Sequence, residues 1–479
     1  MAKPIRLPAS DKEMRPDLRR ADSDPQARYL KMTTQPIPKL IVSMAVPAIC
    51  SQIVTSLYNI ADTYFVGSIG TSATAAPGVA MPLLMIIQAV SLMLAMGAGS
   101  LAARQLGARE DEDANRTIST AFFLSVMIGT VIGAISLAVL EPIMIICGAT
   151  ETILPYACDY AFWIILATPF YSATFVLSAV VRQEGNVRLS VIGTVAGAVV
   201  NCVLDPILIF VFDLGIIGAA VATSLSQMVS FAILFSHMVS GKCVLKLGWR
   251  YFSPRWRVLW EIFKVGAPDL FRNGLLSVAN ILLNNAAGVY GDAPLAGMGI
   301  VTKIINVMVM VLMGFGQGYQ PMCGYCFGAK LYGRVKEGLW FSLRVCLTAM
   351  TAMAAVSFLL APEMIAVFRG DDPEVIDVGS RILRAHVVVL PMATVTIIAN
   401  MLFQSCGRAI KSGMIALSRN GLVLIPTILY LPRVFHLDGV IWAQSVADLL
   451  TFVIALFMLI HELGRLRALE RQALPDGAA

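Results

Sequence analysis

Twelve long apolar runs, joined by short polar connections, occupy almost all of this 479-residue chain after its first 38 residues. A helix that crosses a bilayer needs about 20 mostly apolar residues, and each run meets that length. Charged residues make up only 14% of the chain, which excludes an ordinary soluble domain. The sequence therefore predicts an all-α polytopic membrane protein with 12 transmembrane helices. The expected spans are residues 40–66, 76–102, 118–140, 155–181, 189–212, 215–239, 258–289, 294–322, 338–360, 381–404, 412–433 and 437–461.

The distribution of basic residues among the connections predicts the orientation of the chain. Alternate connections carry clusters such as Arg104 and Arg109, whereas the connections 67–75 and 213–217 between them have no Lys or Arg. Because basic loops remain in the cytoplasm, this pattern places both termini there. We therefore attribute the net charge of +6 to the basic residues of the cytoplasmic connections, and we expect no nucleic-acid partner.

The chain consists of two similar halves, which a shift of about 220 residues superimposes. Pro47 falls on Pro268, and the Gly107 region falls on the Gly328 region, with the same loop polarity. Parallel repeats of this kind normally enclose a substrate site near the membrane midplane. The predicted organisation is two six-helix lobes related by internal repeat. Its parts are a disordered cytoplasmic tail (1–38), the N-lobe (39–239), a cytoplasmic linker (240–257), the C-lobe (258–463) and a cytoplasmic tail (464–479).

Two acidic residues, Asp62 and Asp205, lie inside apolar runs of the N-lobe. Carboxylates inside spanning helices are costly and usually mark an ion or substrate pathway. Asn201 precedes Asp205 by four residues, which places both on one helix face, and Thr223 lies at a similar depth in the next span. We expect these four side chains to converge in the outer half of the N-lobe. The alternative is that Asp62, the shallowest, only caps a neighbouring segment or lies at a wet helix end.

Two ions suit such a cluster of oxygen-bearing side chains. Burial and a neighbouring carboxylate both favour a bound proton. Carboxylate, amide and hydroxyl oxygens also suit a hard cation such as Na⁺. The sequence does not distinguish H⁺ from Na⁺, and it predicts no cofactor and no other metal.

Polar residues within the C-lobe spans predict a substrate cavity. Asn280 and Asn284 share one helix face, Gln317 follows on the next span, and Lys303 lies about nine residues from the outer side. We include Tyr58 of the first span in the same candidate cavity. The alternatives are hydrogen bonding between helices for the amides and a structural ion pair for Lys303.

Several motifs in this order resemble the multidrug and toxic compound extrusion (MATE) family, over about residues 38–463. They are the run Tyr58–Gly67, the run Gly97–Ser100, the run Asn201–Pro206 and the run Gly316–Pro321. The acidic first and fifth spans resemble the prokaryotic DNA-damage-inducible branch and its multidrug-exporting relatives. That resemblance implies cation-coupled antiport, with coupling residues Asp62, Asn201, Asp205 and Thr223. Another branch has its essential carboxylates in the C-lobe, and this chain departs from that pattern.

The function predicted is a secondary active multidrug efflux antiporter that exports lipophilic or cationic compounds in exchange for H⁺ or Na⁺. No phosphate-binding Gly-x-x-x-x-Gly-Lys motif is present, and the four histidines are scattered, so we predict neither ATP drive nor an enzyme. Alternatives are a lipid-linked glycan flippase, an ion channel or a membrane enzyme. We expect a monomer in the prokaryotic inner membrane, with amphipathic small molecules and membrane lipids as its partners.

Overall fold

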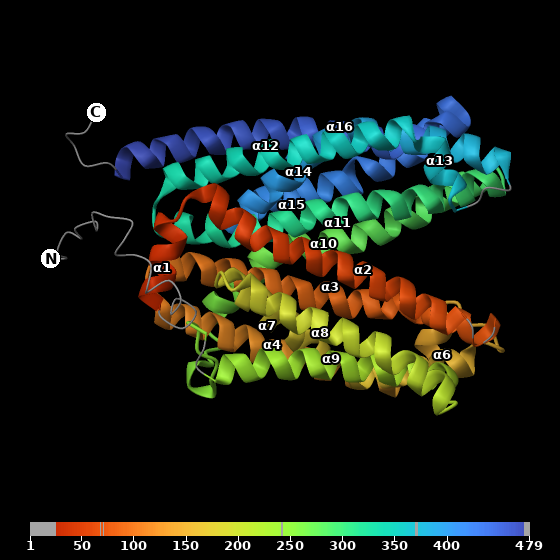
Figure 1. Cartoon of the computed structure of the whole chain (residues 1–479), viewed down its shortest axis with the longest axis horizontal. Coiled ribbons are helices and arrows are strands. Elements are labelled where there is room, and N and C mark those ends of the chain that lie inside the picture. The colour runs from red at the N-terminus through yellow and green to blue at the C-terminus, as the bar shows by residue number, and fades with distance from the viewer. Residues whose placement is uncertain (1–24, 68, 70, 241–242, 369–371, 474–479) are drawn as a thin grey trace.

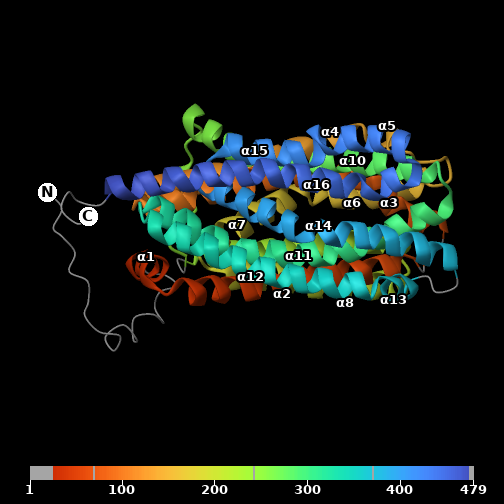
Figure 2. The ribbon, with the colours of Figure 1, turned by 90° about the horizontal axis from the view of Figure 1, so that it is seen from above.

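The computed structural model describes residues 25–67, 69, 71–240, 243–368 and 372–473, and this part of the chain contains helices and no strand. Figures 1 and 2 show that the long helices run along one common axis. The first described residues, in α1, and the last, in α16, lie at the same end of this bundle, which we call the terminal end. The opposite end is called the far end.

The N-lobe consists of α2 to α9, and its helices follow the apolar runs of the sequence. Their bounds are α2 (Ile37–Gly67), α3 (Thr71–Gly107), α4 (Asp111–Ala138), α5 (Leu140–Ile146), α6 (Leu154–Leu166), α7 (Thr168–Gln183), α8 (Val187–Pro206), the π-helical turn η2 (Ile207–Val211) and α9 (Gly215–Val239). The run expected as one span at 155–181 is two helices, α6 and α7, bent by 51°. Pro169 near the start of α7 cannot donate a backbone hydrogen bond, which explains the break.

The C-lobe repeats this plan. Its elements are the short turn η3 (Trp249–Tyr251), α10 (Trp256–Gly288), α11 (Asp292–Gly328), α12 (Tyr332–Leu359), α13 (Ala361–Ala366), α14 (Pro373–Ser405), α15 (Ala409–Leu417), the π-helical turn η4 (Ser418–Leu422) and α16 (Leu424–Ala473). Non-helical backbone at His436 divides α16: the part before it completes the eleventh span, which begins with α15, and the part after it is the twelfth span.

Length and hydropathy agree with twelve spans. Among the described residues, nine helices are long and apolar enough to cross a membrane, or ten when α6 and α7 count as one span. One of the nine is the continuous stretch 409–472, which the kink at His436 divides in two. The remaining span is α10, whose charged and amide side chains lower its hydropathy.

Residues 25–34 form helix α1 (Pro25–Thr34), so the disorder predicted for the first 38 residues is wrong for this part. It is also wrong for residues 37 and 38, which begin α2, and residues 1–24 lie outside the described residues. The side chains of Arg28 and Met32 are buried against the rest of the protein, and these distant contacts stabilise a helix that its local composition does not predict.

The two lobes meet along a glycine seam near the terminal end, formed by Gly97 and Gly107 on α3, Gly266 on α10, and Gly318 and Gly328 on α11. A Cβ atom on Gly266 would lie 1.9 Å from the carbonyl oxygen of Met93 on α3, and one on Gly97 would lie 2.1 Å from that of Ile262 on α10. Because no side chain fits there, the helix backbones approach each other directly.

The seam follows the internal repeat. Gly107 approaches the carbonyl oxygen of Tyr325, and Gly328 approaches that of Arg104. The two glycines are 221 residues apart in the sequence (328 − 107), and so are the two residues whose carbonyl groups they approach (325 − 104). The lobes therefore contact each other through equivalent surfaces, as expected when two copies of one bundle pack about an approximate twofold axis.

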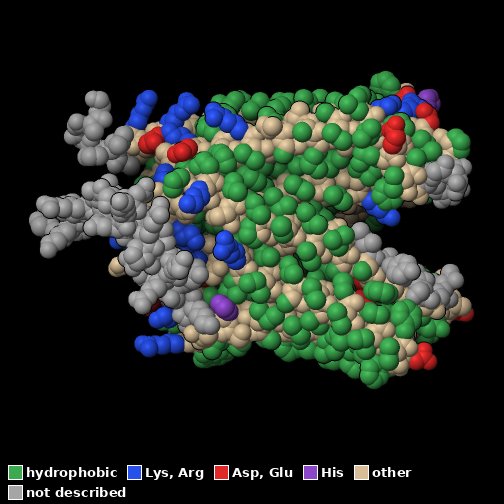
Figure 3. Space-filling model, in the orientation of Figure 1, with side chains coloured by type: hydrophobic (Ala, Val, Ile, Leu, Met, Phe, Trp, Pro, Cys, Tyr) green, Lys and Arg blue, Asp and Glu red, His purple; other side chains and the backbone are tan. Residues whose placement is uncertain are grey.

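Contact between the lobes is lost toward the far end. On α2, Ala45 touches Gly318 and is buried, Gln52 and Ser56 on the same helix face are partly exposed, and Asn59 is exposed. On α11, Val307 lies on the face of Gly318 and is 52% exposed. Figure 3 shows the resulting hollow between the lobes at the far end, and lysine and arginine side chains gathered at the terminal end.

Candidate functional site

Helix α8 positions the centre of the candidate site. Asn201 and Asp205 lie one turn apart on its buried face, just before Pro206 and the widened turn η2. The amide nitrogen of Asn201 donates to Asp205 Oδ1 at 3.3 Å and to Thr223 Oγ1 on α9 at 3.4 Å. One amide therefore links the carboxyl group to the hydroxyl group.

Two acceptor atoms in this group have no hydrogen-bond partner among the described residues, Asn201 Oδ1 and Asp205 Oδ2. Both atoms are buried, and a buried acceptor without a partner is costly. A proton on the carboxyl group or a small hard cation would satisfy such oxygens. These oxygen atoms therefore suit either H⁺ or Na⁺, the two ions considered from the sequence.

Asp62 on α2 lies near Asp205 on α8, close enough for the two carboxyl groups to influence each other electrostatically. Tyr58, one turn before Asp62, interacts electrostatically with both carboxyl groups. The structure thus brings Asp62, Asn201, Asp205 and Thr223 together inside the N-lobe. It also places Tyr58 beside this cluster, and the expected contribution of Tyr58 to the substrate cavity stays a prediction.

Two aromatic residues of the cluster escaped the sequence analysis. Tyr160 on α6 lies near Asp62, Asp205 and Tyr58, and Tyr171 on α7 lies near Tyr58. A tyrosine hydroxyl within an apolar span is a detectable signal. The direction in which the hydroxyl group points, however, depends on the 51° bend between α6 and α7. The spacing of residues in the sequence does not reveal this bend.

Asn280 and Asn284 of α10 and Lys303 of α11 lie toward the far end, on helix faces that meet the N-lobe nearer the terminal end. Asn280 and Asn284 lie four and five turns beyond Gly266 on the face of α10 that meets α3, and both side chains are exposed. Lys303 is exposed on α11, three turns before Gly314, which itself packs against α2. The role of these three residues in a substrate cavity stays a prediction.

Gln317 lies elsewhere, in the closed region between the lobes. Its side-chain oxygen accepts a hydrogen bond of 2.5 Å from Arg182 Nη1 on α7. This bond joins the N-lobe to the C-lobe beside the glycine seam, so the geometry gives Gln317 a partner within the protein.

A second polar network, which the sequence analysis did not identify, crosses the same closed region. Asp269 on α10 is buried and forms an ion pair of 3.0 Å with Arg272. The amide of Gln404 donates to Asp269 and its side-chain oxygen accepts from Gln320 at 3.1 Å. Ser100 of α3 donates to the backbone carbonyl of Gln404 at 2.6 Å, which ties the two lobes together. The Asp-x-x-Arg spacing is the only local sign of this network.

These features define a class of protein: a polytopic helical membrane protein with two repeated lobes, a hollow between them, and a buried carboxyl group beside a half-buried one in one lobe. The MatE family model matches residues 47–207 and 268–429, one stretch in each lobe. The chain therefore belongs to the MatE family.

Relatives and solved structures agree with this assignment. The chain is 26% identical over 448 residues to the multidrug export protein MepA of Staphylococcus haemolyticus (strain JCSC1435), covering 92% of this chain and 97% of that protein. It is 25% identical to MepA of Staphylococcus aureus (strain MSSA476), covering 91% and 96%.

Among solved structures, the fold matches a MATE protein in its straight conformation with a TM-score of 0.86 and 23% identity, covering 92% of this chain and 99% of that one. It also matches a superfamily transporter from Pyrococcus furiosus Vc1 (DSM3638), described as having a binding pocket of reverse polarity, with a TM-score of 0.86 and 23% identity, covering 91% and 98%. These structural matches establish the fold.

Proposed function

We propose that this protein is a secondary multidrug efflux antiporter, which exports lipophilic, often cationic compounds in exchange for H⁺ or Na⁺. The observation that carries the proposal is the cluster of Asp62, Asn201, Asp205 and Thr223, in which the buried Asn201 and Asp205 each have one acceptor atom without a partner among the described residues. The names of the staphylococcal relatives support export of drugs as the task of the transport cycle.

The coupling proposal follows from the position of α2. This helix carries Asp62 in the ion cluster and Ala45 in the glycine seam. Binding of an ion would relieve repulsion between Asp62 and Asp205 and thereby change the preferred path of α2. An ion that binds the two arrangements of α2 with different affinity shifts the balance between them, as coupled transport requires.

For substrate binding, we assign the hollow between the lobes. Its exposed walls combine apolar side chains of α2 and α11 with Asn280, Asn284 and Lys303 of the C-lobe. Apolar walls with few polar groups suit amphipathic compounds of varied shape. In this scheme the hollow opens to the outside and the glycine seam closes the cytoplasmic side. We further propose a monomer in the bacterial plasma membrane, with both termini in the cytoplasm.

Dye efflux from membrane vesicles tests this function when pH and Na⁺ gradients are imposed separately. We expect one gradient alone to drive efflux. Asp205→Asn should abolish that dependence because the amide neither takes up a proton nor supplies a negative ligand. Asp213→Asn is the matched control, since it makes the same chemical change at an exposed position eight residues later. Gradient-driven efflux by Asp205→Asn at the control rate would contradict the assignment, and conductance without substrate would indicate a channel.

A further inference from the structure

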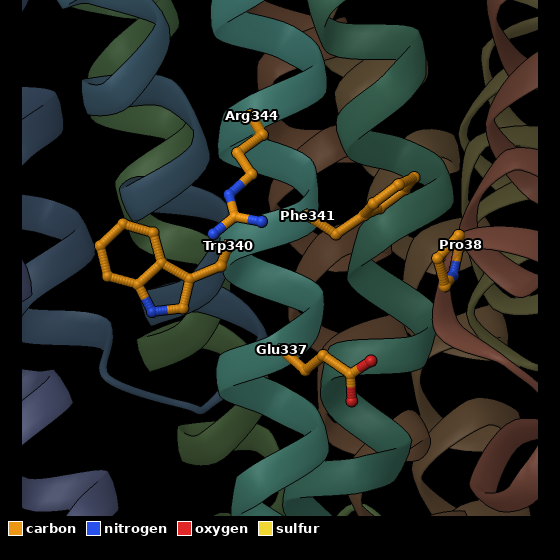
Figure 4. Close-up of a pocket in the computed structure, with 5 residues that line it drawn as sticks. All are labelled: Pro38, Glu337, Trp340, Phe341 and Arg344. Carbon is orange, nitrogen blue, oxygen red and sulfur yellow. The ribbon is translucent and has the colours of Figure 1, made fainter.

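One face of α12 combines opposite charges with aromatic side chains. Glu337, Trp340, Phe341 and Arg344 are spaced by three, four and seven residues, so they follow one helix face. Together with Pro38 at the start of α2 they line a groove of about 520 Å³ (Figure 4). The groove therefore contacts both lobes, because α2 begins the N-lobe and α12 belongs to the C-lobe.

The depth of this groove follows from helix geometry. Arg344 lies 15 residues before the last residue of α12, Leu359, which corresponds to about 22 Å along the helix axis. Glu337 lies 22 residues before Leu359, or about 33 Å. The hydrocarbon core is about 30 Å thick. When Leu359 lies at the far edge of the hydrocarbon, the groove extends from about 8 Å inside the hydrocarbon, at the Cα of Arg344, to the headgroup layer at the terminal end, at Glu337.

The charges in the groove are available to a ligand. Glu337 and Arg344 are exposed, and neither side chain forms an ion pair or hydrogen bond with another described residue. The neighbouring Lys336, in contrast, is paired with Glu470 on α16. Figure 4 shows the side chain of Arg344 extending along the helix toward Trp340 and Glu337, which brings its guanidinium group closer to the headgroup layer.

We propose that this groove binds the headgroup of a phospholipid that carries a primary ammonium group, namely phosphatidylethanolamine. The guanidinium of Arg344 presents paired N–H donors that match a phosphodiester, and the Glu337 carboxylate accepts from the lipid ammonium. Trp340 lies at the depth where indole rings favour the membrane interface. Phe341 and Pro38 supply an apolar wall for the start of the acyl chains. This site is distinct from the ion cluster and from the hollow between the lobes.

Other lipids share parts of this chemistry, and Glu337 distinguishes them. A phosphatidylglycerol headgroup has a phosphodiester for Arg344 but brings a negative charge without an ammonium group. Phosphatidylcholine has a positive charge but no N–H group to donate to the carboxylate. The two charged residues together therefore predict a preference for phosphatidylethanolamine over both.

Native mass spectrometry of the full-length protein in detergent tests the proposal, with each of the three lipids added separately. We expect phosphatidylethanolamine to bind the unaltered protein most tightly, and Arg344→Gln to raise its Kd at least tenfold. Glu337→Gln should remove the preference for phosphatidylethanolamine over phosphatidylglycerol, and the variant should still bind phosphatidylglycerol. Arg344→Lys should restore part of the binding because it retains the positive charge.

Arg433→Gln is the matched control, because it removes an exposed arginine of the C-lobe outside this groove. Equal binding of all three lipids, or an Arg344→Gln variant that binds phosphatidylethanolamine as the Arg433→Gln variant does, would overturn the proposal. A preference for phosphatidylglycerol that survives Glu337→Gln would also overturn it.

Discussion

The glycine seam makes a quantitative prediction at Gly266. Its missing side chain allows α10 to contact the α3 backbone, and an added Cβ would lie 1.9 Å from the Met93 carbonyl oxygen and 2.7 Å from the carbonyl carbon. Weak C–H to oxygen contacts in proteins have a carbon–oxygen distance of about 3.3 Å. The helices would have to separate by the difference, 3.3 − 1.9, or about 1.4 Å.

Gly266→Ala should therefore weaken the arrangement in which the lobes are closed at the terminal end. Forced overpacking of this kind typically costs about 1–3 kcal/mol, which corresponds to about a 5- to 150-fold change in an equilibrium constant. Replacing Gly by Ala within a helix also stabilises the helix by about 1 kcal/mol through helix propensity. The control variant must therefore contain a Gly→Ala change in the same helix.

Gly274→Ala provides this control, because it lies eight residues later in the same helix and a Cβ there meets no atom within 4 Å. Spin labels at the exposed positions Glu112 on α4 and Arg467 on α16 report the separation of the lobes at the terminal end. We expect a longer distance population in Gly266→Ala alone. Identical distance distributions and melting temperatures for the two variants would refute the proposed role of the seam.

Three other variants test contacts at the terminal end. Glu462→Gln should lower the free energy of unfolding by about 3–5 kcal/mol, because the buried carboxylate pairs with Arg408 and Lys411; thermal unfolding measures this, and a loss below 1 kcal/mol would contradict it. Arg28→Ala should speed alkylation of the buried Cys326 by loosening α1, which mass spectrometry detects, and an unchanged rate would show that α1 does not shield this thiol. Burial raises the pKa of Cys243, between α9 and α10, to about 12 from its model-compound value of 9.0. The protonated thiol should therefore persist at pH 8 and react with iodoacetamide about a thousandfold more slowly than an ordinary thiol, a difference that alkylation of a variant retaining only Cys243 would reveal or disprove.

Much of the fold was predictable because membrane insertion imposes a strong local rule. The first span was expected at 40–66 and α2 extends over Ile37–Gly67, since hydropathy alone determines where a helix can cross. Hydropathy does not determine bends. It missed the break between α6 and α7, where Pro169 removes a backbone donor within one continuous apolar run.

The candidate ion cluster was predictable where spacing along one helix fixes direction. Asn201 and Asp205 are four residues apart, and they lie on one face of α8 in hydrogen-bond contact, as that spacing requires. Tyr160 was not predictable because its approach to Asp62 depends on the bend between α6, which carries it, and α7. The roles of these residues in coupling stay predictions until the efflux experiment is performed.

Helix α1 has a practical consequence for handling the protein. It lies before the stretch that the family model matches, and it contacts both lobes: Arg28 donates to the backbone of Glu184 in the N-lobe, and Cys326 of α11 donates to the backbone of Met32. An affinity tag or fluorescent fusion attached directly before Pro25 would therefore be anchored across the junction between the lobes. Attachment after Ala473, at the end of a long single helix, avoids that junction and is the better choice for purification and labelling.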